Sequence, residues 1–179
     1  EQSAWPKQAR REETFDTAHL EEAARLLGPR TLLLLGGRFL SAVACSAAQR
    51  IGAKTGALVL IETFPARVRR EGPAAALRRL PYLSEMAAST LANIDTIVLA
   101  GAAYPVAFFA LPGRPTRLAP DHARVLNLAA PGSTIEGALN TLASILQAPK
   151  IEPSILDRPA KLENGGAIDP ASLAQSIAA

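Results

Sequence analysis

The chain has 179 residues, of which 49% are hydrophobic and 20% are charged, and its formal net charge is +3. This composition fits one domain with a buried core, and it contains no apolar run of the roughly 20 residues that a membrane-spanning helix needs. A single cysteine excludes an internal disulfide framework, and the start of the sequence shows no signal peptide, so we expect a cytoplasmic protein without a membrane partner.

Positive charge is concentrated in one segment near the middle of the chain. Five arginines lie close together there: Arg67, Arg69, Arg70, Arg78 and Arg79. Surfaces that bind nucleic acid usually add stacking aromatic side chains to such charge, and only 4% of this chain is aromatic. We therefore interpret the segment as a solvated or domain-facing loop and expect no nucleic-acid partner.

The first elements alternate between helix and strand. Asp16 can cap a helix over residues 17–27, which Gly28-Pro29 ends. The apolar run Leu32–Leu35 is typical of a strand that is buried on both faces, as in a parallel sheet. A helix over residues 39–51 follows, and its small side chains allow it to approach that sheet closely.

Three further apolar runs continue the pattern: Leu58–Ile61, Ile97–Leu99 and Val125–Leu128. Ser84 is placed to cap a helix to about residue 93, and residues 116–118 fit a short strand within a proline-rich loop. Strands that alternate with helices predict a three-layer α/β fold, with about six parallel strands and helices on both faces. We expect all four apolar runs to be central strands buried on both sides.

The last part of the chain contains two helix starts separated by a linker. Ser133–Glu136 has the pattern of a capping box, which would open a helix to about Leu146. Residues 147–167 are irregular and hold several prolines and glycines, as linkers do. Asp169-Pro170 then supplies the cap and the first position of a final helix.

The first predicted strand ends at a Gly36-Gly37 turn. Ligands of parallel sheets bind at the carboxyl ends of strands, where backbone N–H groups attract phosphate. The turn lacks the G-x-G-x-x-G spacing of a dinucleotide site, although Glu62, after the second strand, stands where an acidic residue would hold a ribose. A nucleotide site and a purely structural turn both remain open on these residues.

The residues by themselves indicate no catalytic or metal site. His19 and His122 have no cysteine or carboxylate cluster at the spacing of metal ligands. Cys45 lies in the helix of small residues, which favours a buried core thiol over a nucleophile. The sequence contains neither a G-x-S-x-G elbow nor a P-loop.

A series of motifs nevertheless resembles a known family. The series consists of Gly36-Gly37, Thr63 with Ala66-Arg67, Leu80-Pro81-Tyr82, Leu91 with Asp95, Gly101, Pro105-Val106 and Phe108-Phe109. Over about residues 17–147, the order and spacing of these motifs resemble the central domain of thiamine diphosphate-dependent enzymes. The resemblance is to the acetolactate synthase large-subunit-like and benzoylformate decarboxylase-like branch.

This resemblance implies a domain organisation. Residues 1–15 would be a linker from an N-terminal pyrimidine-binding domain, and residues 16–148 the central, NAD/FAD-binding-like α/β domain. Residues 149–179 would be a linker and the first helix of a C-terminal pyrophosphate-binding domain. The family's activating glutamate belongs to the first of these domains and its G-D-G…N motif to the third, and neither motif is found here.

The resemblance also implies a function for the longer protein. We expect a structural, non-catalytic fragment of a 2-keto acid carboligase or decarboxylase whose other two domains belong to the same chain. The parent enzyme would bind thiamine diphosphate and magnesium, which supply the reactive chemistry, and would form a homo-oligomer.

Some relatives also bind FAD or ADP at the strand ends of the central domain. Flavin-dependent relatives have an acidic end on the strand where this chain has Asn127 and Ala129. We therefore expect at most a vestigial nucleotide site, and no bound flavin. Its residues would be Gly36, Gly37, Thr63 and Gly101. The alternatives are a stand-alone module that binds FAD, ADP or NAD, and a purely structural interaction domain.

Overall fold

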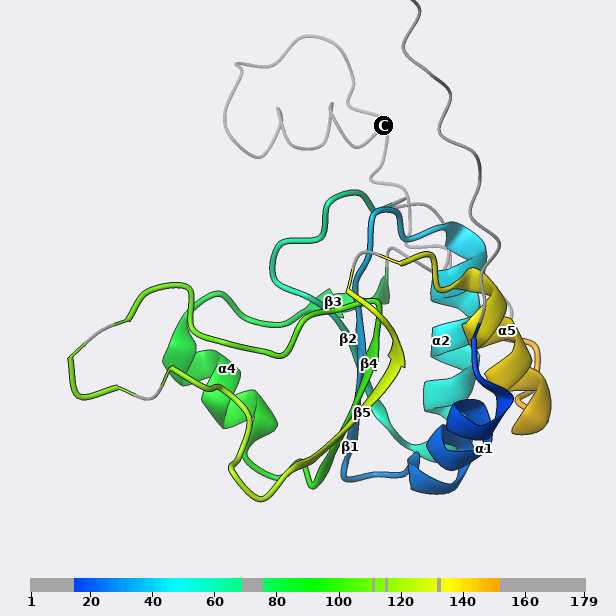
Figure 1. Ribbon diagram of the computed structural model, residues 1–179, viewed down its shortest axis with the longest axis horizontal. Helices are drawn as coiled ribbons and strands as arrows, with labels where there is room; N and C mark the ends of the chain where they lie inside the picture. Colours follow the sequence, from blue (N-terminus) through cyan, green and yellow to red (C-terminus); the bar gives the residue numbers. More distant parts are fainter. Residues whose placement is uncertain (1–14, 69–75, 111, 115, 132, 152–179) are drawn as a thin grey trace, which may run out of the picture.

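The fold is built on one parallel sheet, seen in a computed structural model that describes residues 15–68 and 76–151, except 111, 115 and 132 (Figure 1). The sheet order is β3-β2-β1-β4-β5. The strands are β1 (Thr31–Leu35), β2 (Leu58–Ile61), β3 (Arg78–Arg79), β4 (Thr96–Ala100) and β5 (Arg124–Ala129). The helices are α1 (Thr17–Leu26), α2 (Ala42–Thr55), α4 (Ser84–Leu91) and α5 (Glu136–Ile145). The predicted α/β fold is confirmed, with five strands in the described residues rather than about six.

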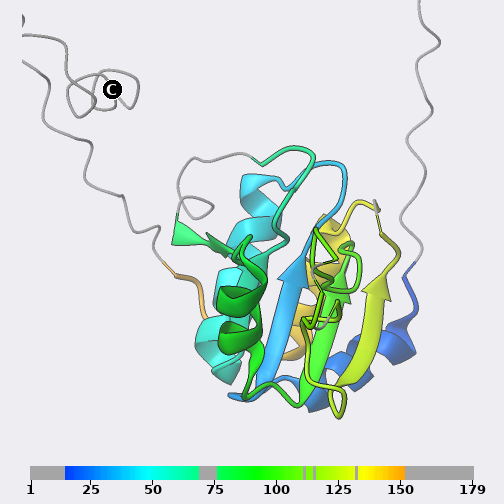
Figure 2. The same cartoon turned by 90° about the vertical axis from the view of Figure 1, so that its left-hand side faces the viewer.

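Helices cover both faces of the sheet. Helices α1, α2 and α5 lie on one face, and α4 lies on the other together with the long loop that follows β4 (Figures 1 and 2). Strand β1 supplies both cores, because Leu33 and Leu35 pack with the three helices while Leu32 and Leu34 pack on the side of α4. All four leucines are fully buried, which explains the continuous apolar run.

Strand β5 departs from the prediction. It forms an edge of the sheet, and only Leu126 and Leu128 are buried, on the side of α1 and α5. Val125 is 36% exposed and Asn127 is exposed too. The expectation that Val125–Leu128 would be central and buried on both sides is therefore wrong, because α4 packs over β1, β2 and β4 and leaves this part of the face uncovered.

The helix caps agree with the sequence at α1 and differ elsewhere. Asp16 accepts a hydrogen bond from the backbone N–H of Ala18, at 2.9 Å, as an N-cap should. Ser84 is instead the first residue of α4, where Leu83 is the cap and makes no side-chain cap bond. The predicted capping box at Ser133–Glu136 is also wrong, because α5 begins at Glu136 and Ile135 is its cap.

The proline-rich loop after β4 folds back on itself. Val106 and Arg117 form one antiparallel bridge, so the short strand expected at residues 116–118 is reduced to a single pair. Leu118 and Ala119 are buried in the core beside α4, and the Arg117 guanidinium stacks over Tyr104 at 4.8 Å. The final helix predicted after Asp169-Pro170 lies outside the described residues.

Polar contacts join the amino ends of the strands. Asp95, just before β4, accepts a 2.5 Å hydrogen bond from Arg30 and lies 3.2 Å from the His122 Nε2 atom.

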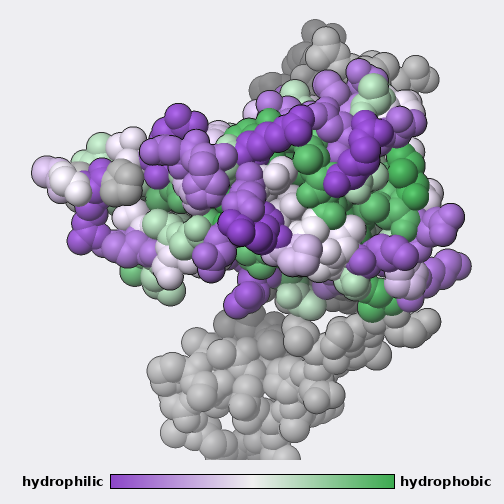
Figure 3. Space-filling model, turned by 90° about the horizontal axis from the view of Figure 1, so that it is seen from below, coloured by the Kyte–Doolittle hydropathy of each residue, from purple (hydrophilic) through white to green (hydrophobic). Residues whose placement is uncertain are grey.

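Hydrophilic residues cover much of the surface at the end of the molecule where the strands begin, with hydrophobic patches between them (Figure 3). Within the described residues, no helix is both long enough and apolar enough to cross a membrane.

Leu33→Ala tests whether β1 organises the core. Loss of a fully buried leucine side chain from a central strand is expected to lower the free energy of unfolding by about 2–5 kcal/mol. Val43→Ala is the matched control, because Val43 is 50% exposed on α2 and should cost well below 1 kcal/mol. Urea unfolding measures both, and equal losses would contradict the buried position of Leu33.

Candidate functional site

The candidate site lies at the carboxyl ends of β1 and β4. The strand order reverses there, because β2 and β3 lie to one side of β1 while β4 and β5 lie to the other. Such a reversal creates the crevice in which open α/β sheets bind ligands. Gly36 follows β1 and Gly101 follows β4, and both are buried at this point.

The two strand ends approach too closely for a side chain between them. The Gly36 N–H donates to the carbonyl of Ala100 at 2.9 Å. A Cβ atom on Gly36 would lie 2.5 Å from the Ala102 Cα and 2.6 Å from a carboxylate oxygen of Glu62. Gly37 has a φ of +114°, and a Cβ there would lie 2.4 Å from the carbonyl oxygen of Ser133. The Gly-Gly sequence is thus required by packing alone.

Glu62 fills the position at the turn that an anion would take. Its carboxylate accepts hydrogen bonds from the backbone N–H groups of Gly37, at 3.3 Å, and Ala103. Its own N–H donates to the carbonyl of Leu35 at 2.8 Å, which fixes it at the end of β1. Burial raises the pKa of Glu62, and the two backbone hydrogen bonds offset only part of that shift. Glu62, the residue predicted to stand where a ribose would be held, therefore binds the backbone of the glycine turn instead.

A shallow cavity of about 230 Å³ lies beside this carboxylate. Gly37 and Gly101, two of the predicted site residues, line it together with Glu62 and Phe64. Thr63 is bound elsewhere, because its hydroxyl donates to the carbonyl of Leu80 at 3.1 Å. Nucleotide binding by the four predicted residues therefore stays a prediction, with Thr63 engaged on the side of β3.

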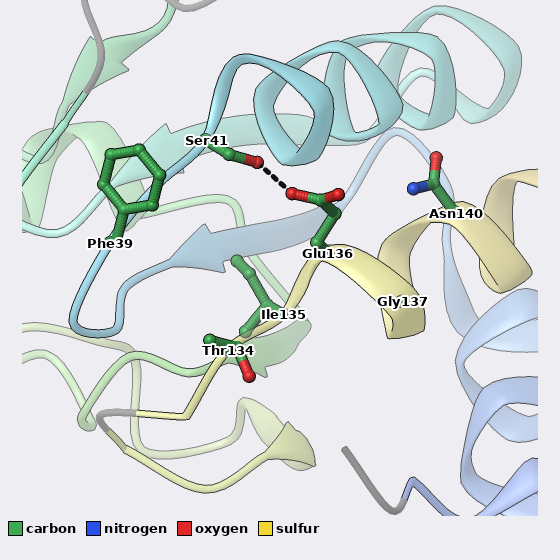
Figure 4. Close-up of a pocket in the computed structure, with 7 residues that line it drawn as sticks. All are labelled: Phe39, Ser41, Thr134, Ile135, Glu136, Gly137 and Asn140. Atoms are coloured by element: carbon green, nitrogen blue, oxygen red, sulfur yellow. Dashed lines mark hydrogen bonds between the residues drawn. The ribbon is translucent and has the colours of Figure 1, made fainter. Parts of the chain in front are cut away.

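A second cavity, of about 350 Å³, lies between the starts of α2 and α5 (Figure 4). The Ser41 hydroxyl, which caps α2 by accepting from the Ala44 N–H at 3.1 Å, donates to the Glu136 carboxylate at 2.5 Å. Glu136 stands at the positive end of α5, where a carboxylate is favourable. Sequence reasoning identified Glu136 as part of a local cap and missed its partner, because Ser41 is 95 residues away.

The remaining candidate residues do not join this region into a catalytic centre. Cys45 is fully buried and desolvation raises its pKa to about 11, as expected of a core thiol. His19 is exposed on α1, while His122 contacts Asp95 at the amino ends of the strands, the end of the sheet opposite to the candidate site. Asn127 is exposed on the edge strand. Within the described residues, no three side chains of histidine, cysteine, aspartate or glutamate are grouped to hold a metal ion.

Comparisons with known proteins place these features in context. The chain is 42% identical over 118 residues to the Mycobacterium tuberculosis (strain ATCC 25618 / H37Rv) protein named "Putative acetolactate synthase large subunit IlvX". This match covers 66% of the chain and 22% of that relative, so the chain spans about a fifth of the relative's length. No protein-family model matches the chain.

Two solved structures share the fold. One is a "putative thiamin diphosphate-dependent enzyme" from Mycobacterium smegmatis, with a TM-score of 0.52 and 20% identity over 81% of this chain and 31% of the other. The second is the thiamine diphosphate-dependent 4-hydroxybenzoylformate decarboxylase of Rhodococcus jostii RHA1, with a TM-score of 0.53 and 19% identity over 92% of this chain and 35% of the other. Both are much longer than the part they share with this chain.

The position of Glu62 predicts a pH dependence of stability. Its folded-state pKa is raised above the ordinary value of 4.5, so the folded state binds the proton more tightly than the unfolded state does. The free energy of unfolding should therefore fall as the pH rises from about 4.5 through the raised pKa. Glu62→Gln cannot ionise and keeps an oxygen that accepts from the Gly37 N–H, so its stability should fall less over this interval.

Urea unfolding between about pH 4 and pH 8 measures this difference. Glu21→Gln is the matched control, since Glu21 is exposed on α1 and its replacement should leave the slope of the wild-type chain unchanged. Equal pH slopes for Glu62→Gln and the wild-type chain would show that the Glu62 carboxylate is not desolvated by the turn.

A nucleotide should not stabilise the chain measurably, because the N–H groups of the turn are already bonded: that of Gly37 to Glu62 and that of Gly36 to Ala100. A ligand at a hundred times its dissociation constant would add about 2.7 kcal/mol, which shifts the melting temperature of such a domain by several degrees. We expect colourless protein and no shift with FAD, ADP or NAD. A yellow protein, or a rise in the melting temperature with ADP, would contradict this.

Proposed function

Because the chain is homologous to a segment of an acetolactate synthase large-subunit-like protein, we propose that it is the central domain of a longer thiamine diphosphate-dependent enzyme. That enzyme would act on a 2-keto acid as a carboligase or decarboxylase. The observation that carries the proposal is the 42% identity over 118 residues, which spans two thirds of this chain and 22% of the relative. The two structural relatives, each covered to about a third, support the same fold.

The role of this domain in the longer enzyme is structural. The crevice that would hold a ligand in an open α/β sheet is narrowed by the close approach of Gly36 and Ala102, and the Glu62 carboxylate already accepts from the Gly37 N–H there. At the second cavity, Glu136 is already bound to Ser41. The Ser41 hydroxyl is itself engaged as the cap of α2, and among the described residues no histidine, cysteine or lysine lines either cavity.

Thiamine diphosphate and magnesium would be held by the pyrimidine- and pyrophosphate-binding domains of the same polypeptide. The cofactor supplies the electron sink for carbon–carbon bond cleavage and formation, and the protein supplies binding and orientation. The proposed parent is a cytoplasmic homo-oligomer. In it, residues 16–148 would separate the two cofactor-binding domains and hold them at a set distance.

The stand-alone nucleotide module is the weaker alternative. It would need free N–H groups at the turn and an acceptor for the ribose hydroxyls. The carboxylate of Glu62 accepts from Gly37 and Ala103, so it cannot hold a ribose in the same position. On β5, Asn127 and Ala129 offer no carboxylate in its place.

Titration calorimetry with thiamine diphosphate and Mg²⁺ tests the proposal. The 179-residue chain should give no binding heat, whereas the complete product of its reading frame should bind the cofactor and release CO₂ from 2-keto acids. Micromolar binding by the chain alone would contradict its non-catalytic role. A complete product that neither binds thiamine diphosphate nor consumes a 2-keto acid would contradict the proposed parent enzyme.

A further inference from the structure

Four aromatic side chains form an exposed cluster beyond the carboxyl ends of the strands, here called the aromatic face. Phe64 follows β2, Tyr82 follows β3, and Phe108 and Phe109 follow β4. Their exposed fractions are 60%, 46%, 63% and 59%. The rings contact one another at centroid distances of 4.8–6.3 Å, mostly in edge-on or tilted arrangements.

The aromatic face is large for a surface that only contacts water. An aromatic side chain buries about 150–250 Å² when it is covered, so four rings that are about half exposed present roughly 450 Å² of apolar surface. The largest apolar patch on a typical monomer is about 300–600 Å² and is often functional. A contiguous patch made of aromatic rings is also the composition that protein interfaces enrich at their centre.

The loops that carry these rings are fixed before any partner binds. The N–H of Ala107 donates to the carbonyl of Thr116 at 2.7 Å, and the N–H of Leu118 donates to that of Pro105 at 3.1 Å. On the other side, Thr63 is tied to Leu80 through its hydroxyl. A docking surface that is already ordered loses little conformational entropy on binding.

Exposed arginines flank the residues of the aromatic face in the sequence. Arg67 lies three residues after Phe64, and Arg78 and Arg79 immediately precede the segment that leads to Tyr82, and all three are exposed. Among the described residues of these loops and of α4, the carboxylates are Glu62, held by the glycine turn, Glu85, paired with Arg114, and Asp121, three residues before β5. The rim formed by the residues that flank the rings in the sequence is therefore positive.

This charge decides what can cover the aromatic face. Two copies of the chain meeting through it would bring their arginine rims together, and like charges across an interface cost several kcal/mol. A partner that presents an apolar centre within a rim of carboxylates would satisfy both the rings and the arginines. The chain's relatives extend well beyond the part they share with it, so in a longer polypeptide of that kind a further domain is available to cover the aromatic face.

We propose that the aromatic face is the surface on which an adjacent domain of the longer enzyme docks, through an apolar patch rimmed by carboxylates. The inference rests on the proposed function, because the occupant is another domain of the same polypeptide. Phe64 also lines the cavity beside Glu62, so the docked domain would lie over the closed glycine turn.

Phe109→Ser tests the proposal in two proteins, the 179-residue chain and the complete product of its reading frame. In the chain, where the ring is largely exposed, we expect the melting temperature to change by about 2 °C or less. In the complete protein, where the ring would be covered, we expect a loss of more than about 5 °C. Val43→Ser is the matched control, an exposed apolar residue on α2 that should be neutral in both proteins.

Hydroxyl-radical footprinting with mass spectrometry provides the second measurement. Oxidation of Phe64, Tyr82, Phe108 and Phe109 should be at least about fivefold lower in the complete protein than in the chain, as expected of rings in a desolvated interface. Equal oxidation, together with a Phe109→Ser effect that is the same in both proteins, would overturn the docking inference.

The two proposals fail in different ways. If the complete protein binds thiamine diphosphate but its four aromatic rings are oxidised as much as those of the 179-residue chain, the proposed function stands and the docking inference is wrong. If the reading frame encodes no further domain, the proposed function fails, and the docking inference fails too because no adjacent domain exists to cover the aromatic face. Self-association of the chain that is abolished by Phe109→Ser would instead identify a second copy as the occupant and overturn the inference.

Discussion

The close approach of two backbone segments at the end of β1 is the constraint on which the rest of this structure depends. Gly36 and Ala102 are so near that a single Cβ atom would not fit between them. This contact brings the ends of β1 and β4 together at the point where the sheet order reverses, and it leaves Glu62 facing the backbone N–H of Gly37. Beyond this contact, the loops that follow β2, β3 and β4 carry Phe64, Tyr82 and Phe108, whose rings meet on one surface.

Features that depend on burial within one strand could be predicted from the sequence, and features that depend on distant partners could not. Leu32–Leu35 reads as a central strand because a run without alternation has no solvent-facing side. Val125–Leu128 became an edge strand instead. Asn127 interrupts its apolar run on the face that α4 leaves uncovered, and the prediction gave this sign of one-sided burial too little weight. Glu136 fits a capping box by spacing, but its partner is Ser41, which only the packing of α2 against α5 brings near.

The candidate site shows the same division. Gly36, Gly37 and Gly101 could be placed at the strand ends because glycines after buried strands mark tight turns. That Glu62 would turn back onto these glycines depends on the distance between β1 and β2, which sequence spacing does not contain. The family resemblance contributed most where single motifs were weak, and the 42% identity to an acetolactate synthase large-subunit-like protein confirms it. The same motifs include Tyr82 and Phe108-Phe109, but their order in the sequence gave no sign that the rings touch.

The burial of Cys45 has a practical consequence for labelling the chain at a chosen site. The only thiol of the chain is fully buried, and its pKa of about 11 keeps it protonated and unreactive at neutral pH. Maleimide and disulfide reagents should therefore not react with the native domain, so Cys45 need not be replaced. A cysteine introduced at the surface of the chain would then be its single reactive attachment point, so a spectroscopic probe could be placed on either face of the sheet against an otherwise unaltered background.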